Sequence, residues 1–259
     1  MADTSWLRQT KVAPLFPDLL WSRPENRRRA GKLLIIGGNS HSFAAVSAAY
    51  GAASKAGIGT AKIVLPRTLE KTLGKVFPEA EFAPSTPSGS FARAALGQLI
   101  EATEWADGVL LAGDLGRNSE TAILLESFVD KYQGPLTLAD DSLDYFLDNS
   151  EQLINKQRTV LVADLGQLQK LVVKRVLIKH SMDLSQLVMA LSGLTKDTAA
   201  AITTHHAGQI IVAAGGQVST TPAPQVDLTQ LAAYASVWQL QQPAQTFEAL
   251  ACAAYCYSE

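Results

Sequence analysis

The chain has 259 residues, and 22 Lys and Arg against 24 Asp and Glu give it a formal net charge of −2. This length fits one large α/β domain, and a hydrophobic share of 47% allows a sizeable core. The charge balance excludes a broad electrostatic field for nucleic acid or an anionic membrane. Neither a signal-peptide core nor an apolar stretch of about 18 residues is present. We therefore expect a cytoplasmic protein without nucleic-acid or membrane partners.

The order of predicted elements indicates an α/β fold. Three prolines in the first 31 residues predict an irregular lead-in before a single domain over 32–259. The predicted strands cover residues 32–36, 60–65, 108–112, 136–138, 159–162, 200–204, 209–213 and 218–220. The predicted helices cover residues 43–56, 67–75, 90–104, 119–131, 165–173, 183–192, 228–240 and 245–257. Strands that alternate with helices form βαβ units, which predicts a mostly parallel sheet.

Two local patterns carry further expectations. Ser40 or Ser42 would cap the Ala-rich helix over 43–56, because a serine hydroxyl can accept a hydrogen bond from a free helix amide. Cys252 and Cys256 would share one face of the last helix. Without further ligands nearby, this pair predicts two buried thiols rather than a metal site.

Candidate functional residues follow four predicted strands, because ligands of open parallel sheets collect at the carboxyl ends of strands. They are Gly37, Gly38 and Asn39, then Gly113 and Gly116, then Asp140 and Asp141, and then His205 and His206. The carboxylates of Asp140 and Asp141 could hold Mg²⁺ through water, or they could cap the next helix. The glycine pairs and the histidine pair also suit plain turns. No dinucleotide fingerprint is present, which argues against hydride transfer.

Taken in order, segments from Leu19 to Tyr257 resemble the ADP- or ATP-dependent NAD(P)H-hydrate dehydratase family of the ribokinase-like superfamily. The similar segments are Gly31–Gly38, Ala49–Pro66, Pro78–Glu79, Ala106–Gly116, Leu136–Leu143 and Phe247–Ala249. The resemblance implies a three-layer α/β/α fold with a mostly parallel central sheet. It implies that a nucleotide phosphorylates the hydroxyl of hydrated NADH or NADPH, after which phosphate leaves. Mg²⁺ and ATP or ADP would then be the cofactors of an active protein.

The resemblance also implies site residues, and the sequence departs from several of them. The implied ligand contacts are Gly37, Gly38, Asn39, Glu79, Gly113, Gly116, Asp141 and His205. The family's Gly-Ser-Gly-Asp has no counterpart, because residues 222–231 read PAPQVDLTQL, and Asp227 is the one carboxylate there that could act as base. The family's Thr-Pro-His-Pro-Gly-Glu becomes residues 162–167, without its His and Glu. Asp114 replaces a turn glycine, and a like charge beside a phosphate costs about 4 kcal/mol.

These departures favour a divergent family member, a pseudoenzyme in which dehydration is impaired or lost while binding of a nucleotide or NAD-like ligand persists. One alternative is an active dehydratase with Asp227 as base, Asp141 on Mg²⁺ and His205 in place of the family's lysine. A second is a sugar or vitamin kinase of the same superfamily. Relatives in this superfamily often self-associate, which favours a homo-oligomer. We expect a small molecule as the partner.

Overall fold

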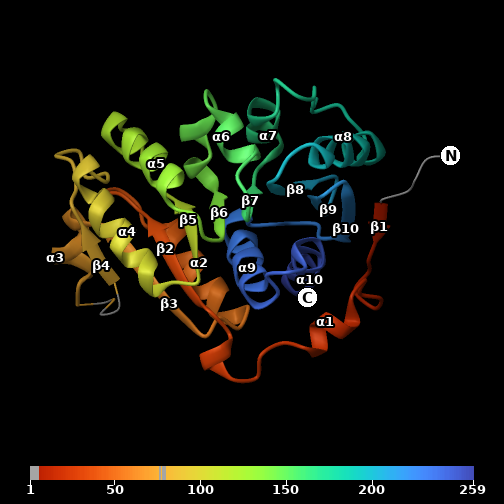
Figure 1. Ribbon diagram of the computed structural model, residues 1–259, viewed down its shortest axis with the longest axis horizontal. Helices are drawn as coiled ribbons and strands as arrows, with labels where there is room; N and C mark the ends of the chain where they lie inside the picture. The colour runs from red at the N-terminus through yellow and green to blue at the C-terminus, as the bar shows by residue number, and fades with distance from the viewer. Residues whose placement is uncertain (1–5, 76, 78–79) are drawn as a thin grey trace.

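The computed structural model describes residues 6–75, 77 and 80–259, which form one ten-stranded sheet between two layers of helices (Figure 1). The strands are β1 (Trp6–Arg8), β2 (Lys32–Gly37), β3 (Thr60–Pro66), β4 (Ala80–Ala83), β5 (Gly108–Gly113), β6 (Leu136–Ala139), β7 (Thr159–Val162), β8 (Ala201–His206), β9 (Gln209–Ala214) and β10 (Gln217–Pro222). The helices are α1 (Pro17–Trp21), α2 (Ala44–Lys55), α3 (Glu70–Leu73), α4 (Leu96–Trp105), α5 (Ser119–Lys131), α6 (Ser150–Ile154), α7 (Leu165–Leu171), α8 (Leu184–Lys196), α9 (Leu228–Gln241) and α10 (Thr246–Ser258).

The sheet is mostly parallel, as the sequence predicts. Its strand order is β1-β10-β9-β8-β7-β6-β5-β2-β3-β4. All pairs from β4 to β8 are parallel, β9 is antiparallel to both β8 and β10, and β1 is parallel to β10. The carboxyl ends of β2, β3, β5, β6, β7, β8 and β10 therefore meet at one edge of the sheet, where ligands of such folds bind.

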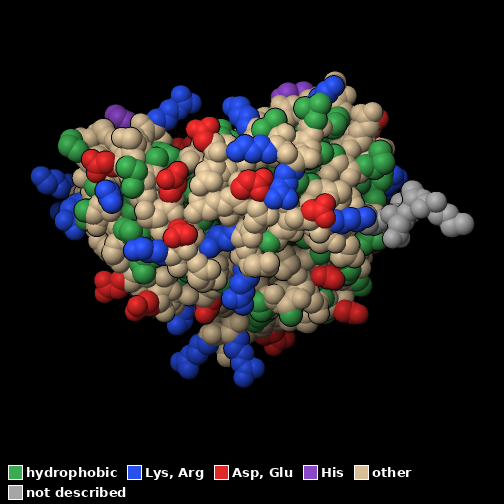
Figure 2. Space-filling view, turned by 45° about the horizontal axis from the view of Figure 1, so that its top comes forward, with side chains coloured by type: hydrophobic (Ala, Val, Ile, Leu, Met, Phe, Trp, Pro, Cys, Tyr) green, Lys and Arg blue, Asp and Glu red, His purple; other side chains and the backbone are tan. Residues whose placement is uncertain are grey.

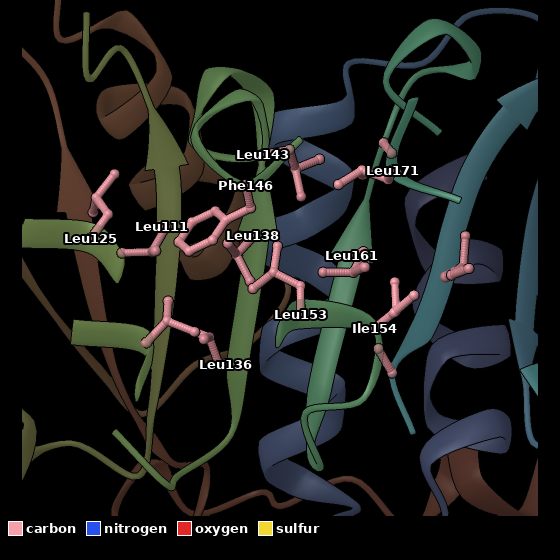
Figure 3. Close-up of a cluster of buried hydrophobic side chains, with 14 of the residues drawn as sticks. Leu111, Leu125, Leu136, Leu138, Leu143, Phe146, Leu153, Ile154, Leu161 and Leu171 are labelled. Carbon is pink, nitrogen blue, oxygen red and sulfur yellow. The ribbon is translucent and has the colours of Figure 1, made fainter. Parts of the chain in front are cut away.

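Both faces of the sheet are buried, which explains why its central strands read as continuous apolar runs. Alternate residues of one strand enter different cores: Leu111 packs with α4–α8 on one face, whereas Leu110 packs with α2, α9 and α10 on the other. Figure 3 shows the first core, in which leucines of β5–β7 face Phe146 and residues of α5 and α6. No described helix has the length and apolarity that a membrane crossing requires.

The amino-terminal segment corrects one expectation. Residues 6–8 form β1 and extend the sheet beside β10, so the lead-in is not wholly irregular. The buried Gln9 side chain fixes it there, donating from Nε2 to Thr221 Oγ1 at 2.7 Å and to the Ala251 carbonyl at 2.8 Å. The three prolines act later in the segment, because all of them follow residue 13. The boundary predicted at residue 32 therefore does not separate this segment from the sheet.

Other differences are local. The sequence analysis did not predict β4 or α6, which are each only a few residues long. The helix predicted over 90–104 begins later, at Leu96, after an isolated bridge between Ser85 and Phe91 and a 3-10 turn. The predicted cysteine pair lies on α10 as two free thiols, of which Cys252 is buried and Cys256 is half-buried.

Candidate functional site

The first two candidate strand ends, those of β2 and β5, touch one another through glycine. A Cβ added to Gly37 would lie 2.4 Å from the Gly113 carbonyl oxygen, so only glycine fits there. The Gly38 amide donates to that same oxygen at 2.9 Å. Asn39 is buried and donates from Nδ2 to the Asp114 carbonyl at 2.6 Å. The predicted residues of β2 and β5 thus form one hydrogen-bonded network.

Asp114 caps the helix that follows β2, which corrects the expected cap. Its carboxylate Oδ2 accepts the Ala45 amide of α2 at 2.7 Å. The N-cap residue Phe43 provides no side-chain hydrogen bond, and Ser42 accepts only from Ala44, at 3.3 Å. Asp114 reaches this position with a φ of 57°, in the left-handed region that non-glycine residues rarely adopt. The positive end of the α2 dipole is therefore already balanced by a carboxylate of the protein.

Asp141 fixes the Gly113–Gly116 turn. Its two carboxylate oxygens accept the amides of Leu115 and Gly116, both at 3.1 Å. The pKa of the Asp141 carboxyl is raised to about 6, chiefly by burial. The nearby Asp140 and Asp114 carboxylates also raise this pKa, and the two hydrogen bonds from Leu115 and Gly116 lower it. The Gly113–Gly116 turn is thus held by charge-assisted hydrogen bonds.

Asp140 shares this crowded environment. It has a φ of 54°, and its carboxylate lies against Gly113, where a Cβ would come within 2.4 Å of Oδ2. Burial raises the pKa of Asp140, the amides of Asp141 and Asp114 lower it, and the Asp114 and Asp144 carboxylates raise it. Two left-handed aspartates on adjacent strand ends indicate backbone strain concentrated at this edge.

The segment aligned with the family's His and Glu forms a helix start instead. Asp164 caps α7 by accepting the Gln167 amide at 2.7 Å, and Gln167 completes the capping box. Gln167 also donates from Nε2 to the Asp140 carbonyl at 2.9 Å and to Asp144 Oδ1 at 3.1 Å. The glutamine therefore joins α7 to the loop after β6.

A pocket of about 660 Å³ opens beside this network. Its lining residues are Gly116, Arg117, Asn118, Ser119, Asp141, Asp144, Tyr145, Leu147 and Lys170. The Tyr145 hydroxyl donates to the Gly116 carbonyl, which connects the pocket wall to the turn. The ion pairs in the described part of the chain are Lys62–Glu81 and Arg175–Glu151. Arg117 and Lys170 are in neither, and their charges are available to an anion.

The predicted residues His205 and Asp227 lie at a separate loop, between β10 and α9. His205 Nε2 lies 2.8 Å from the Ala223 carbonyl oxygen and donates to it. Asp227 caps α9: its carboxylate accepts the Gln230 amide at 3.0 Å and Gln230 Nε2 at 3.1 Å. His206 instead contacts the Met182 carbonyl, so the two histidines do not converge on one ligand.

The structure thus joins most predicted ligand residues but not all. Those of the β2, β5 and β6 ends lie in one network, whereas His205 and Asp227 border the other loop. Glu79, with Pro78, lies outside the described residues. In residues 6–75, 77 and 80–259, no three His, Cys, Asp or Glu side chains are grouped to hold a metal ion. Water-mediated binding of Mg²⁺ by Asp141 stays a prediction.

Sequence reasoning missed four residues of this site: the capping role of Asp114, and Tyr145, Gln167 and Lys170. Tyr145 could have been found, because it lies four residues after Asp141 and just beyond the Leu136–Leu143 segment. No local signal pointed to the others, since their contacts join elements far apart in the chain.

No protein-family model matches the chain. Two curated relatives do, each named a bifunctional NAD(P)H-hydrate repair enzyme. The enzyme of Moorella thermoacetica is 28% identical over 134 residues, which are 48% of this chain and 25% of the relative. The enzyme of Salinibacter ruber is 29% identical over 146 residues, which are 54% of this chain and 27% of the relative. The matched region spans about a quarter of the length of these relatives.

Solved structures share the fold. A ribokinase-like superfamily protein of Enterococcus faecalis superposes with a TM-score of 0.74 at 16% identity, covering 100% of this chain and 88% of that one. An ADP/ATP-dependent NAD(P)H-hydrate dehydratase of Bacillus subtilis, co-crystallised with ATP and Mg²⁺, gives 0.63 at 13% identity, with 95% and 87% covered. The protein therefore has a ribokinase-like fold. Its sequence relatives confirm the predicted resemblance to the NAD(P)H-hydrate dehydratase family.

Proposed function

We propose that this protein is a NAD(P)H-hydrate dehydratase-like protein that binds a nucleotide or NAD-like ligand and has lost nucleotide-dependent dehydration of hydrated NAD(P)H. The observation that carries the proposal is the start of α9, where the Asp227 carboxylate is bound by Gln230 of the same helix. This is the position at which the family's Gly-Ser-Gly-Asp would supply both an anion hole and a base.

Phosphoryl transfer depends on hydrogen-bond donors that are already aimed at the developing negative charge. In this chain the loop over 222–227 contains no glycine, and its Asp227 places a negative charge at the helix end. Asp114 does the same at α2. A transferring phosphate would meet carboxylates at both helix ends, where repulsion replaces stabilisation.

The described residues also fit a catalytic Mg²⁺ poorly. Asp141 already uses both oxygens to accept backbone amides, and no other carboxylate completes a group of three ligands among residues 6–75, 77 and 80–259. Mg²⁺ prefers near-octahedral oxygen ligands, several of them water. We therefore derive no metal-assisted step for this chain.

Ligand binding is supported by the 660 Å³ pocket beside Gly116. Its cations Arg117 and Lys170 can neutralise a phosphate, and Tyr145 offers an aromatic face with a hydroxyl. A volume of this size lies in the range of small-molecule sites, about 300–1,000 Å³. The pocket residues are distinct from Asp227, so binding can persist where transfer does not.

Two measurements test the proposal. Thermal shift with ATP, ADP, AMP and NAD, each with and without Mg²⁺, is expected to show stabilisation by at least one ligand. Lys170→Ala is expected to reduce that shift, while Lys131→Ala, at the far end of α5, leaves it unchanged. Purified protein given hydrated NADH with ATP or ADP is expected to produce no NADH.

The main alternative is an active dehydratase with Asp227 as base, and one observation favours it: Asp227 lies beside the α9 start, in the loop that His205 contacts through Ala223. Turnover that disappears in Asp227→Asn, with the fold intact, would establish this alternative. Absence of any ligand-induced shift would instead contradict ligand binding. A cytoplasmic location and a homo-oligomeric state stay predictions.

A further inference from the structure

The pocket beside Gly116 carries charges of both signs. Besides the cations Arg117 and Lys170, its lining includes the carboxylate of Asp144 and the ring of Tyr145. In Figure 2, acidic and basic side chains lie interspersed over the upper middle of the molecule, where Figure 1 places α5, α6 and α7. A ligand that carried only negative charge would be attracted by the two cations and repelled by the carboxylate. The charges of the lining therefore say more about the ligand than that it has a phosphate.

Most of the other polar groups that line the pocket are already bound within the protein. Asp141 uses both oxygens to accept amides of the Gly113–Gly116 turn. Asn118 accepts two amides at the start of α5 and donates from Nδ2 to Ser88 at 2.9 Å. The Tyr145 hydroxyl donates to a carbonyl of the turn. These groups fix the shape of the pocket and leave recognition of a ligand to others.

Asp144 has an oriented carboxylate with one free oxygen. Its Oδ1 accepts Gln167 Nε2 at 3.1 Å, and the same nitrogen donates to the Asp140 carbonyl at 2.9 Å. Oδ2 of Asp144 makes no hydrogen bond within the part of the chain that the structure describes. Burial raises the pKa of Asp140, and the nearby carboxylates of Asp114 and Asp144 raise it too. The wall of the pocket that follows β6 is therefore negative.

Tyr145 places an aromatic ring beside this carboxylate. The two residues are consecutive in the chain and line the same pocket. The ring is half-buried, and the hydrogen bond of its hydroxyl to Gly116 holds it in place. An aromatic face attracts a cation within about 6 Å of its centroid, and a carboxylate adds to that attraction. A neutral ring would stack on Tyr145 but would gain nothing from the charge of Asp144.

We propose that the ligand is a nucleotide with a positively charged pyridinium ring, which Asp144 and Tyr145 bind while Arg117 and Lys170 bind its phosphate. Oxidised nicotinamide nucleotides have this distribution of charge. Their reduced forms have the same phosphate and nearly the same size, but the ring is neutral. Asp144 is thus a specificity-determining residue that distinguishes the two oxidation states. This inference rests on the ligand binding proposed above.

Calorimetric titration of the full chain with three mononucleotides tests this preference. The three are nicotinamide mononucleotide, its reduced form and AMP, which share a ribose and a phosphate and differ in the ring. The oxidised nicotinamide nucleotide is expected to bind at least tenfold more tightly than either of the others, which corresponds to about 1.4 kcal/mol. This comparison uses the wild-type protein, so it does not depend on the folding of any variant.

Substitutions assign the preference to one side chain. Asp144→Asn keeps an acceptor for Gln167 and removes the charge, so it should abolish the preference for the oxidised form. Asp148→Asn, at an exposed carboxylate that does not line the pocket, is the matched control and should keep it. Lys170→Ala should weaken the oxidised and reduced forms by the same factor, because it acts on the phosphate. Thermal melts establish that each variant is folded.

The outcomes separate this inference from the proposed function. Equal affinity of the wild type for the oxidised and reduced forms overturns the inference, and so does a preference that survives Asp144→Asn. If AMP or ATP binds and the oxidised nicotinamide nucleotide has no advantage, the ligand binding proposed above stands and this inference alone fails. If none of these nucleotides binds, both fail.

Discussion

The two loops that border the candidate edge of the sheet differ in what holds them. The Gly113–Gly116 turn receives hydrogen bonds from outside itself, because Asp141 accepts two of its amides and Tyr145 donates to its carbonyl. The loop over 222–227 has its own cap, in which the Asp227 carboxylate binds Gln230. It is joined to other elements at Ala223, which bonds to Gly208 and His205, and at the Asp227 amide, which donates to the Tyr257 hydroxyl. The first loop has the glycines Gly113 and Gly116, and these hydrogen bonds fix its conformation. The second has none, and its carboxylate serves helix stability.

If the proposed function is correct, this difference between the loops separates ligand binding from catalysis. The Gly113–Gly116 turn, held by Asp141 and Tyr145, can support one wall of the pocket. An anion hole needs free amides, and those amides are easily taken by a local capping residue.

The largest effect is expected from Gly113→Ala in the first loop. Gly113 has a φ of 114°, and a Cβ would lie 2.4 Å from Asp140 Oδ2. Strain and overpacking together should lower the free energy of unfolding by about 4 kcal/mol. Urea denaturation of Gly113→Ala and the wild type measures this loss of stability. The control is Gly51→Ala, in the middle of α2 with open space around it, which should raise stability by about 0.5–1 kcal/mol. Equal stability of the two variants would contradict this account.

Asp141→Ala should follow, because it leaves the amides of Leu115 and Gly116 without their acceptor. Hydrogen bonds to a charged group contribute about 1.5–3 kcal/mol each, so we expect a loss of about 3 kcal/mol in urea denaturation. Asp148→Ala, at an exposed carboxylate of the same region, should change stability by less than about 0.5 kcal/mol. A loss similar to that of Asp148→Ala would show that Asp141 does not fix the turn.

Asp227→Ala alters the second loop and should have a smaller effect. Loss of an N-cap carboxylate destabilises a helix end by about 1 kcal/mol. If Asp227 is only a cap, Asp227→Asn should keep most of this stability, because asparagine caps almost as well. Thermal denaturation of the wild type, Asp227→Ala and Asp227→Asn compares their stabilities. A drop of several kcal/mol in both variants would point to contacts of Asp227 beyond its own helix.

The smallest effect is a pH dependence, because Asp141 is only partly buried and solvent screens its charge. The pKa of its carboxyl rises from 3.8 to about 6, so between these values the folded protein keeps a proton that the unfolded chain has lost. The free energy of unfolding should therefore fall as pH rises from 3.8 to 6. Asp141→Asn should flatten this interval in denaturation measured at several pH values. If the free energy of unfolding of Asp141→Asn still falls with pH as in the wild type, the dependence belongs to Asp140. Burial raises the pKa of that carboxyl too.

The fold was largely predictable because its signals are local. Continuous apolar runs such as 108–112 and the alternation with helices identified the central strands. Short elements such as β1 were not predictable, since a three-residue strand exists only because β10 offers it an unpaired edge. The β-strand propensity of residues 6–8 carries no information about whether a partner strand is available.

The candidate site was predictable in composition but not in connectivity. Glycines and aspartates at strand ends were visible in the sequence, and six of them meet in one network. Their partners were not visible: Asp114 accepts an amide of α2 that lies 69 residues earlier, and Asp141 accepts amides 26 and 25 residues away. Side chains at such separations are brought together by the sheet, so a sequence pattern records the residue types without the contacts.

The pairing of β1 with β10 has a consequence for how the polypeptide is made. Trp6 donates to Thr220, a separation of 214 residues. During translation β1 therefore stays unpaired until β10, which ends at Pro222, has left the ribosome. Contacts this distant in sequence form late and slow the final step of folding. Strand β1 is thus open to chaperones and proteases until β10 has been made.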